Sequence, residues 1–430
     1  MSVSPARSAA FEILLRVEGT SAYASELLHG AIARRLSARD HHLCTELVMG
    51  VLRWRGALDQ IIARRAGREL KKFDPEVSTS LRLGVYQLLC LDRVPPHAAI
   101  HESVELVKRA RKRSACGMVN AILRSLKNDG AVLDNDAGHP RWLVERWTST
   151  YGPRPTKQIR DYDQRTPAMA VRVSSADLVL ELGREAIELA SGRLLRSAFL
   201  VNAGEITRTD AFSDHRVTVQ DEASQLVALL VGKGQTILDC CAAPGGKTRI
   251  MAEQNPQSTI FALDVHPRRA RLLRRLVPLG NVRVVAADAR SLPLRSNFDR
   301  ILVDAPCTGT GTLARNPEIK WRLDESDILR LQAYQLAITS AAITHVAPGG
   351  RLVYSTCSLE PEENEQVIEK LLAGNPSFHL LSCAHELDNL RSRGDLAWQE
   401  ISSLTSGPYL RTLPGVHPSD GFFAAIIQRE

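Results

Sequence analysis

Apolar residues recur at helical spacing along almost the whole of residues 1–128. Segments such as AAFEILLRVE and STSLRLGVYQLLCLDRV place an apolar side chain at every third or fourth position, which is the period of an amphipathic helix. Pro75 stands at the start of one such segment, and Pro95 and Pro96 separate two others. We see no convincing alternation of the kind that strands show. Residues 1–130 are therefore predicted to form an all-α domain.

A different pattern follows the polar linker of residues 127–140. Two strand-like segments, AMAVRVS and AFLVNAG, alternate with two helical segments, RWLVERWTSTYG and DLVLELGREAIELA. Residues 141–215 are therefore predicted to form a small α+β subdomain.

From residue 217 to the C-terminus, short apolar segments alternate with amphipathic helical ones. The segments TILDCC, IFALDV, VRVVAA, RILVDAP and GRLVYST are continuous and rich in β-branched residues, as expected for parallel strands buried on both faces. The final segment, GFFAAIIQR, is predicted to run antiparallel to them. Strands that alternate with helices indicate a doubly wound, Rossmann-like α/β domain over residues 217–430.

Length and composition limit the class of protein. A chain of 430 residues is too long for one ordinary core, which agrees with several domains. No apolar segment reaches the ~18 residues that a membrane-spanning helix needs. The first residues, MSVSPARSAAFEILLRVEG, lack the long apolar stretch of a secretory signal. We therefore expect a cytoplasmic protein that does not associate with membranes.

The eight cysteines give no sign of a metal site or a disulfide framework. None of them forms a C-x-x-C pair, so we expect no structural zinc. Disulfides are also not expected in a chain of this size without a secretory signal. Most of these thiols are expected to be inert side chains of the core.

The net charge of +7 is unevenly distributed. Residues 1–128 contain 21 Lys and Arg against 12 Asp and Glu, a net charge of +9, and the remainder carries −2. A basic domain joined to a nearly neutral one predicts that the first binds a polyanion and the second carries out chemistry. The densest basic cluster is KRARKR, residues 108–113; a solvated helix face is the alternative interpretation.

The segment LDCCAAPGGKT, residues 238–248, partly matches a phosphate-binding P-loop. Gly246, Lys247 and Thr248 fit the second half of G-x-x-x-x-G-K-[ST], but Cys241 occupies the place of the first glycine. In addition, no segment supplies the magnesium site that such enzymes need. A glycine-rich loop for a different ligand is therefore the better interpretation.

Acidic residues end three successive predicted strands. Asp239, Asp264 and Asp288 share this position, and Asp264 lies 18 residues after Gly246. An acid about 20 residues after the glycine loop binds the ribose in Rossmann sheets. The three acids predict a pocket for S-adenosylmethionine, which has a ribose and an adenine but no phosphate. Each Asp considered alone is also compatible with a helix cap.

Two cysteines follow the next predicted strands. Cys307 in DAPCTGTG and Cys357 in STCSLEPEENE are expected at the carboxyl edge of the sheet, where such folds bind ligands. Thiolates are nucleophiles. In methylation of cytosine C5 a thiolate adds to C6, C5 takes the methyl group, and loss of the C5 proton frees the enzyme. Asp304 is a candidate for binding the N3/N4 edge of the base.

These segments together resemble the signature blocks of RNA cytosine-C5 methyltransferases. The resemblance extends to VQDEASQLVALLV, RNPEIKW and HPSDGFFAAIIQR, and the helical domain is similar to NusB, as in the Fmu/RsmB branch that methylates 16S rRNA. It covers essentially the whole chain. Thr308 replaces the usual serine after Pro-Cys, and Ala314 replaces a common arginine; neither change removes a catalytic group.

The resemblance implies roles for individual residues. Cys357 would be the nucleophile, and Cys307 would assist product release. The assignment between the two cysteines rests on the resemblance, because DNA cytosine methyltransferases use a Pro-Cys nucleophile. The implied contacts to S-adenosylmethionine are Cys241, Ala242, Ala243, Pro244, Gly245, Gly246, Lys247, Asp264, Asp288 and Asp304.

The implied partner is 16S rRNA, either free or within an assembling small ribosomal subunit, and we expect a monomer. Candidate contacts to RNA phosphates are Lys108, Arg109, Arg111, Lys112 and Arg113. Two alternatives stay open. One is a tRNA cytosine-C5 methyltransferase on the same catalytic domain; the other is a non-catalytic RNA-binding or antitermination factor.

Overall fold

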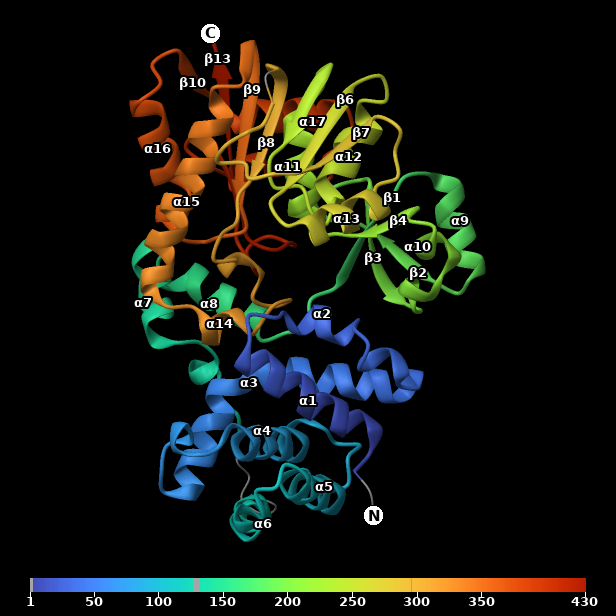
Figure 1. The fold of residues 1–430 in the computed structure, drawn as a ribbon, viewed down its shortest axis with the longest axis vertical. Helices are drawn as coiled ribbons and strands as arrows, with labels where there is room; N and C mark the ends of the chain where they lie inside the picture. Colours follow the sequence, from blue (N-terminus) through green and yellow to red (C-terminus); the bar gives the residue numbers. More distant parts are fainter. Residues whose placement is uncertain (1–2, 127–131, 295) are drawn as a thin grey trace. The chain divides into compact units, whose positions relative to one another are not determined.

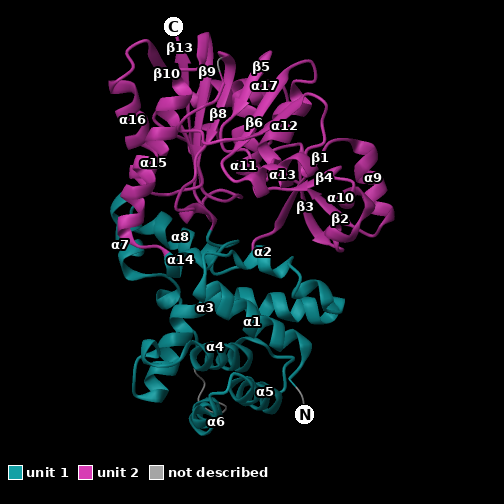
Figure 2. Cartoon of the chain, viewed as in Figure 1, with its two compact units in different colours: residues 1–166, 313–322 teal, residues 167–312, 323–430 magenta. Residues whose placement is uncertain are grey.

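The computed structural model describes residues 3–126, 132–294 and 296–430. It divides into two compact units (Figure 2). Unit 1 consists of residues 1–166 and 313–322, and unit 2 consists of residues 167–312 and 323–430. Among the described residues, no helix is both long and apolar enough to cross a bilayer.

Unit 1 is built from helices, and its described residues contain no strand, as predicted for the N-terminal domain. Helix α3 begins after Ser37, whose Oγ accepts a hydrogen bond from the backbone N–H of Asp40, and ends before Gly67 in the left-handed conformation. The helices are α1 (Pro5–Gly19), α2 (Ala24–Leu28), α3 (Ala38–Ala66), α4 (Pro75–Cys90), α5 (Pro96–Arg109), α6 (Cys116–Ser125), α7 (Arg141–Tyr151), α8 (Pro153–Asp163) and α14 (Ile319–Arg322).

The core of unit 1 lies between α1, α3, α4, α5 and α6, with fully buried side chains such as Ile13, Leu58 and Leu81. Gly50 of α3 allows α4 to come close, since a Cβ at that position would lie 2.0 Å from the Tyr86 ring. The helical periodicity of residues 1–128 therefore reflects one shared apolar core.

The limits of the units differ from the predicted subdomain of residues 141–215. Helices α7 and α8 belong to unit 1. Trp147 of α7 is buried there, and its ring meets the His139 ring edge-on, while the imidazole of His139 lies 3.0 Å from the Asp163 carboxylate. These contacts, which local periodicity does not reveal, join α7 and α8 to His139, directly after the segment Asn135–Gly138, and that segment lies against α3.

Residues 313–322 also belong to unit 1, although their sequence neighbours on both sides lie in unit 2. Trp321 donates its indole N–H to Leu52 O (2.8 Å), and Arg53 donates to Ala314 O (3.3 Å). Gly56 of α3 leaves room for this segment, because a Cβ there would lie 2.6 Å from the Trp321 ring. The RNPEIKW block is thus an integral part of the helical unit.

Unit 2 begins with a small antiparallel sheet of strand order β2-β3-β1-β4. Its elements are β1 (Met169–Val173), α9 (Ala176–Arg184), β2 (Glu188–Ser191), β3 (Ala198–Ala203), α10 (Asp210–Ser213) and β4 (Val217–Val219). The prediction of a helix throughout DLVLELGREAIELA was wrong in its second half. Ala186 adopts a left-handed turn, and Leu189 then pairs with Val201 of β3. Strand pairing overrides the local helical preference.

The large sheet of unit 2 has nine strands in the order β11-β12-β13-β9-β8-β5-β6-β7, with β10 beside β13 (Figure 1). All six predicted strands are present, and the last one is antiparallel to its neighbour β9, as predicted. The strands are β5 (Thr236–Asp239), β6 (Thr259–Asp264), β7 (Val282–Ala286), β8 (Phe298–Asp304), β9 (Val346–Thr356), β10 (Phe378–Leu381), β11 (Thr405–Ser406), β12 (Tyr409–Thr412) and β13 (Phe422–Arg429).

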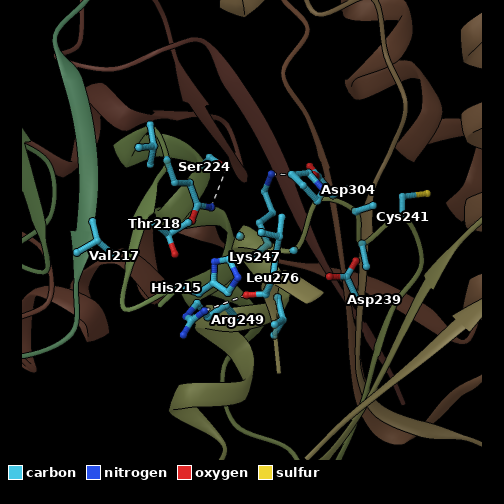
Figure 3. Close-up of a pocket in the computed structure, with 18 of the residues that line it drawn as sticks. His215, Val217, Thr218, Ser224, Asp239, Cys241, Lys247, Arg249, Leu276 and Asp304 are labelled. Atoms are coloured by element: carbon cyan, nitrogen blue, oxygen red, sulfur yellow. Dashed lines mark hydrogen bonds and ion pairs between the residues drawn. The ribbon is translucent and has the colours of Figure 1, made fainter. Parts of the chain in front are cut away.

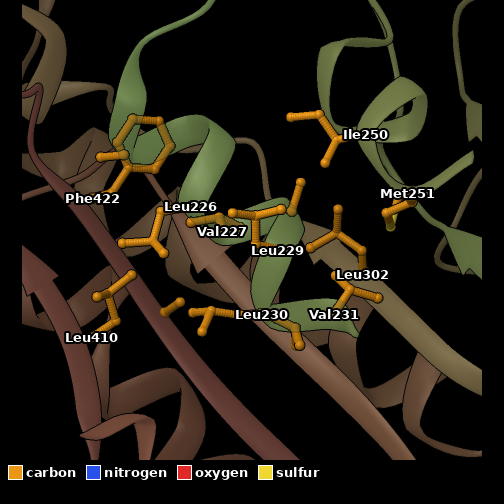
Figure 4. Close-up of a cluster of buried hydrophobic side chains, with 14 of the residues drawn as sticks. Leu226, Val227, Leu229, Leu230, Val231, Ile250, Met251, Leu302, Leu410 and Phe422 are labelled. Carbon is orange, nitrogen blue, oxygen red and sulfur yellow. The ribbon is translucent and has the colours of Figure 1, made fainter. Parts of the chain in front are cut away.

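Helices cover both faces of this sheet, which explains the continuous apolar strands. The helices on one face are α11 (Glu222–Val231), α12 (Gly246–Gln254), α13 (Pro267–Leu276) and α17 (Cys383–Ser392), and those on the other are α15 (Glu325–Ile343) and α16 (Glu365–Ala373). Leu302 of β8 packs with the first set of helices (Figure 4), and its neighbours Ile301 and Val303 pack with the second.

Candidate active site

The glycine-rich loop connects β5 to α12 at the carboxyl edge of the large sheet. Gly245 has a φ of 120°, and a Cβ at that position would lie 2.5 Å from the Val277 side chain. The Ala243–Pro244 peptide bond is cis. A hydrogen bond from Ala242 N to Leu263 O (2.7 Å) ties the loop to β6, and one from Arg269 to Ala243 O (2.8 Å) ties it to α13. The loop is thus a fixed turn in front of a helix N-terminus.

Asp239 lies beneath this loop and is fully buried. Its Oδ2 accepts a hydrogen bond from Thr248 Oγ1 at 2.7 Å. Burial raises the pKa of the Asp239 carboxyl to about 7, and the hydrogen bond from Thr248 opposes this shift. This hydrogen bond therefore ties the first turn of α12, where Thr248 lies, to the end of β5, where Asp239 lies.

Asp264 is the last residue of β6, and Asp288 lies two residues after the end of β7. Asp264 is buried and accepts a hydrogen bond from His266 N at 2.9 Å. Asp288 is half-buried and accepts two hydrogen bonds from the Arg290 guanidinium, which lowers the pKa of its carboxyl. The same guanidinium lies 4.9 Å from the centre of the Tyr334 ring. Tyr334 on α15 was not among the predicted site residues.

A cavity of about 320 Å³ opens beside the loop (Figure 3). It contains the predicted residues 241–247 and Asp304, but Asp264, Asp288, Cys307 and Cys357 are not among its lining residues. A second group of lining residues was not among the predicted site residues. Two of them, Gln220 and Ser224, stand in the VQDEASQ block, which was the signal that could have revealed them. This group includes Phe212, His215, Val217, Thr218, Val219, Gln220 and Ser224.

Lys247 and Asp304 form an ion pair at the cavity. Lys247 Nζ lies 2.7 Å from Asp304 Oδ2, and Ser355 Oγ donates to Asp304 Oδ1 at 2.9 Å. The Lys247 ammonium also lies 5.1 Å from the centre of the Phe422 ring. Asp304 is therefore held in place by partners from α12 and β9.

The two predicted cysteines meet. Cys307 Sγ lies 3.4 Å from Cys357 Sγ, within hydrogen-bond distance for sulfur. The contact with Cys357, burial and the negative charge of Glu363 raise the pKa of the Cys307 thiol. Gly311 N donates to Cys357 O at 2.9 Å, which joins the loop after β8 to the loop after β9.

The five basic candidates of unit 1 differ in their surroundings. Arg109, Arg111 and Arg113 are exposed. Lys108 is paired with Glu105 at 2.5 Å, and Lys112 is paired with Asp74 at 3.0 Å. The three exposed arginines are therefore the better candidates for binding an external anion.

Comparison with known proteins identifies both parts of the chain. The family described as 16S rRNA methyltransferase RsmB/F matches residues 226–428, and the NusB family matches residues 4–128. A probable ribosomal RNA small subunit methyltransferase B from Bacillus subtilis (strain 168) is 32% identical, and the alignment covers 100% of both chains. The ribosomal RNA small subunit methyltransferase B of Klebsiella pneumoniae (strain 342) is 33% identical over 93% of this chain and 92% of its own.

A solved structure agrees with these relatives. The crystal structure of PH0851 matches with a TM-score of 0.83 and 25% sequence identity, over 100% of both chains. The predicted combination of a NusB-like helical domain with a Rossmann-like methyltransferase domain is confirmed. With more than 30% identity to a relative along its full length, the chain belongs to the RsmB/F family of rRNA methyltransferases.

Proposed function

We propose that this protein methylates C5 of a specific cytosine in 16S rRNA, with S-adenosylmethionine as the methyl donor and a transient covalent bond between Cys357 and C6. The observation that carries the proposal is the contact of two thiols, 3.4 Å apart, next to strand ends that hold the Lys247–Asp304 ion pair. Membership of an rRNA methyltransferase family supports the class of substrate.

The residues around the glycine-rich loop fit S-adenosylmethionine. We assign Asp264 to the ribose hydroxyls and Asp288 to the adenine, and residues 241–247 and Asp304 complete the contacts. Residues 241–247 and Asp304 line the cavity of about 320 Å³, a volume within the range of small-molecule sites, whereas Asp264 and Asp288 lie outside its lining. Gln220 Oε1 in the cavity wall is a buried acceptor without a partner among the described residues. The cofactor, when bound, supplies an electrophilic methyl group.

Cys357 begins the reaction as a thiolate that adds to C6 of the cytosine. The electron pair of the C5–C6 double bond then becomes available at C5, which takes the methyl group. Asp304 holds the N3/N4 edge of the base, and the Lys247 ammonium, 2.7 Å from that carboxylate, stabilises the negative charge that the addition places on the ring. Transfer of the C5 proton to solvent leaves the electron pair of that bond to restore the C5–C6 double bond, and the C6–S bond breaks to release the Cys357 thiolate.

Cys307 assists this release. Its thiol stays protonated at neutral pH, because the contact with Cys357 and burial raise its pKa. At 3.4 Å from Cys357 Sγ, the protonated thiol offers a hydrogen-bond donor to the departing thiolate.

The RNA has to present the cytosine outside a base stack, because C6 is not accessible within one. Arg109, Arg111 and Arg113 are proposed to bind phosphates, which gives affinity without reading the sequence. The enzyme would act as a monomer in the cytoplasm, on free 16S rRNA or on an assembling small subunit.

The experiment is methyl transfer from labelled S-adenosylmethionine to unmodified small-subunit rRNA, to assembling small subunits and to bulk tRNA, each tested separately and followed by nucleoside analysis. Labelled 5-methylcytidine in rRNA alone is the expected result. Label in tRNA alone would support methylation of cytosine C5 but would show that the substrate is tRNA and not 16S rRNA. If neither free rRNA nor assembling subunits accept label, the non-catalytic alternative is favoured.

A further inference from the structure

Glu363 is a buried carboxylate between the two cysteine loops. It ends the short 3₁₀ helix Pro361–Glu363, and its side chain is fully buried. The Glu363 carboxylate accepts four hydrogen bonds. Oε1 accepts from Thr308 N (3.0 Å) and from Gln335 Nε2 (2.8 Å), and Oε2 accepts from the hydroxyls of Thr308 and Ser358.

Three of these four donors belong to the residues that directly follow the two reactive cysteines. Thr308 follows Cys307 in the loop after β8, and Ser358 follows Cys357 in the loop after β9. Gln335 of α15 adds a third tie, because its Nε2 also donates to Pro306 O at 2.9 Å. One carboxylate thus connects the residue after each cysteine, and it connects both loops to α15.

Stabilisation of the fold alone is a poor explanation for this arrangement. A buried carboxylate costs free energy by desolvation, and well-packed apolar side chains often replace such groups without loss of stability. Here three of the four hydrogen bonds come from the residues that directly follow the two thiols. The arrangement also accounts for Thr308 in place of the usual serine, because threonine keeps the hydroxyl that donates to Glu363.

We propose that Glu363 is a positioning residue for methyl transfer, whose carboxylate fixes the loops of Cys307 and Cys357 so that their Sγ atoms stay in contact. This inference rests on the proposed function of the two thiols. Glu363 touches neither the base nor the cofactor in this scheme; it acts through Thr308 and Ser358. The negative charge of the carboxylate has a secondary effect, since it opposes ionisation of Cys307.

Two substitutions separate the hydrogen-bond bridge from the charge. In Glu363→Gln the remaining oxygen accepts from Thr308 N and Gln335, and the hydroxyls of Thr308 and Ser358 turn to accept from the new amide, so the bridge persists without charge. Glu363→Ala removes both the hydrogen-bond bridge and the negative charge. Thr308→Val and Ser358→Ala each remove one hydroxyl donor and keep the carboxylate. Glu369→Gln on α16, at an exposed position, is the matched control.

The first readout needs no RNA. Diamide oxidises neighbouring thiols to a disulfide, taking up the two electrons and two protons that the thiols lose. The rate at which a Cys307–Cys357 linked peptide appears, measured by mass spectrometry, therefore reports how often the two Sγ atoms meet. Glu363→Ala, Thr308→Val and Ser358→Ala are expected to slow this rate, and Glu369→Gln is expected to match the wild type. Glu363→Gln keeps the bridge and loses the charge that opposes ionisation of Cys307, so its rate is expected to equal or exceed that of the wild type.

The second readout is methyl transfer. For Glu363→Ala we expect kcat to fall on the order of 10²-fold, the loss that a displacement of about 1 Å causes, with the KM for S-adenosylmethionine unchanged. Glu363→Gln should retain most of kcat. If the Ala variant does not fold, as seen in its Tm, the Thr308 and Ser358 variants provide the test.

The proposal would be overturned if Glu363→Ala, Thr308→Val and Ser358→Ala formed the Cys307–Cys357 disulfide at the wild-type rate. It would also be overturned if Glu363→Gln lost as much of the crosslinking rate and of kcat as Glu363→Ala. If the wild type methylates no RNA, the proposed function fails, while the crosslinking rates still decide whether Glu363 positions the thiols.

Discussion

The Sγ atoms of Cys307 and Cys357 lie 3.4 Å apart, although 50 residues separate the two cysteines in the chain. Parallel pairing of β8 with β9 places Asp304 opposite Ser355, so both strands end at the same level. The loops that follow are joined by the hydrogen bond from Gly311 N to Cys357 O and by the ties to Glu363. The contact is therefore a product of strand register and two loops.

This contact predicts opposite behaviour of two cysteine variants. Cys307→Ala should accumulate a covalent protein–RNA adduct, because addition of Cys357 to C6 is intact and the hydrogen-bond donor to the departing thiolate is lost. Cys357→Ser should form no adduct. Denaturing gels of protein with labelled RNA measure both, and Cys383→Ser, which changes a buried thiol of the core, is the control. The reverse pattern would exchange the roles of the cysteines and leave the reaction class intact.

The Lys247–Asp304 pair predicts losses in kcat when either partner becomes neutral. Asp304→Asn and Lys247→Met should each lower kcat by about 10²–10³-fold, the usual cost of removing one preorganised polar group from an active site. Steady-state methylation kinetics measure the effect. Lys233→Met, which changes an exposed lysine of the same unit, should leave kcat unchanged. Equal activity of all three variants would contradict the assigned roles.

The close approach of Gly311 to Gly421 predicts a steric effect on stability. A Cβ at Gly311 would lie 2.2 Å from Gly421 O, so Gly311→Ala forces the backbone apart and should destabilise the protein by about 1–3 kcal/mol. Gly117→Ala in α6, where nothing lies within 4 Å of the new Cβ, should be neutral or stabilise by about 0.5 kcal/mol. Denaturant unfolding compares the two, and equal effects would refute the steric argument.

Buried Lys320 predicts a dependence of stability on pH. Its Nζ donates to Gly138 O (2.8 Å) and Arg53 O (3.2 Å), and burial lowers the pKa of its ammonium to about 7. The unfolded chain, with a lysine pKa of about 10.4, binds more protons between these values. Lys320 therefore contributes stability that increases as pH rises above about 7, by up to ~1 kcal/mol per pH unit.

The measurement is the free energy of unfolding of the wild type relative to Lys320→Met at pH 7, 8 and 9. The difference should move in favour of the wild type as pH rises. A difference that stays constant would mean that Lys320 remains protonated in the folded protein.

The exposed arginines of residues 109–113 predict a change in the salt dependence of RNA binding. Replacing Arg109, Arg111 and Arg113 by Ala should weaken binding and reduce the slope of log K against log salt by about 2–3, since each phosphate contact contributes roughly 0.7–0.9. Titrations at several salt concentrations measure the slope. Arg391 and Arg393 are paired with Asp388 and Asp395, so their replacement should change it little. An unchanged slope would show that residues 109–113 form a solvated face.

The sequence by itself determined the strands and helices of the catalytic domain and the kind of chemistry at its edge. Apolar strands such as TILDCC are recognisable because burial on both faces leaves a continuous local pattern. The glycine loop and the two cysteines follow such strands, so their shared edge of the sheet could be predicted.

Only the tertiary structure decided which of these residues touch. Residues Glu188–Ser191 form a strand because they pair with β3. Residues 313–322 belong to unit 1 because they form hydrogen bonds to α3 and to Gly138 O. The sulfur contact, the position of Glu363 between two loops and the burial of Lys320 likewise depend on side chains distant in the chain. Local periodicity records how much of a segment is buried, whereas the identity of its partner is fixed by packing between segments.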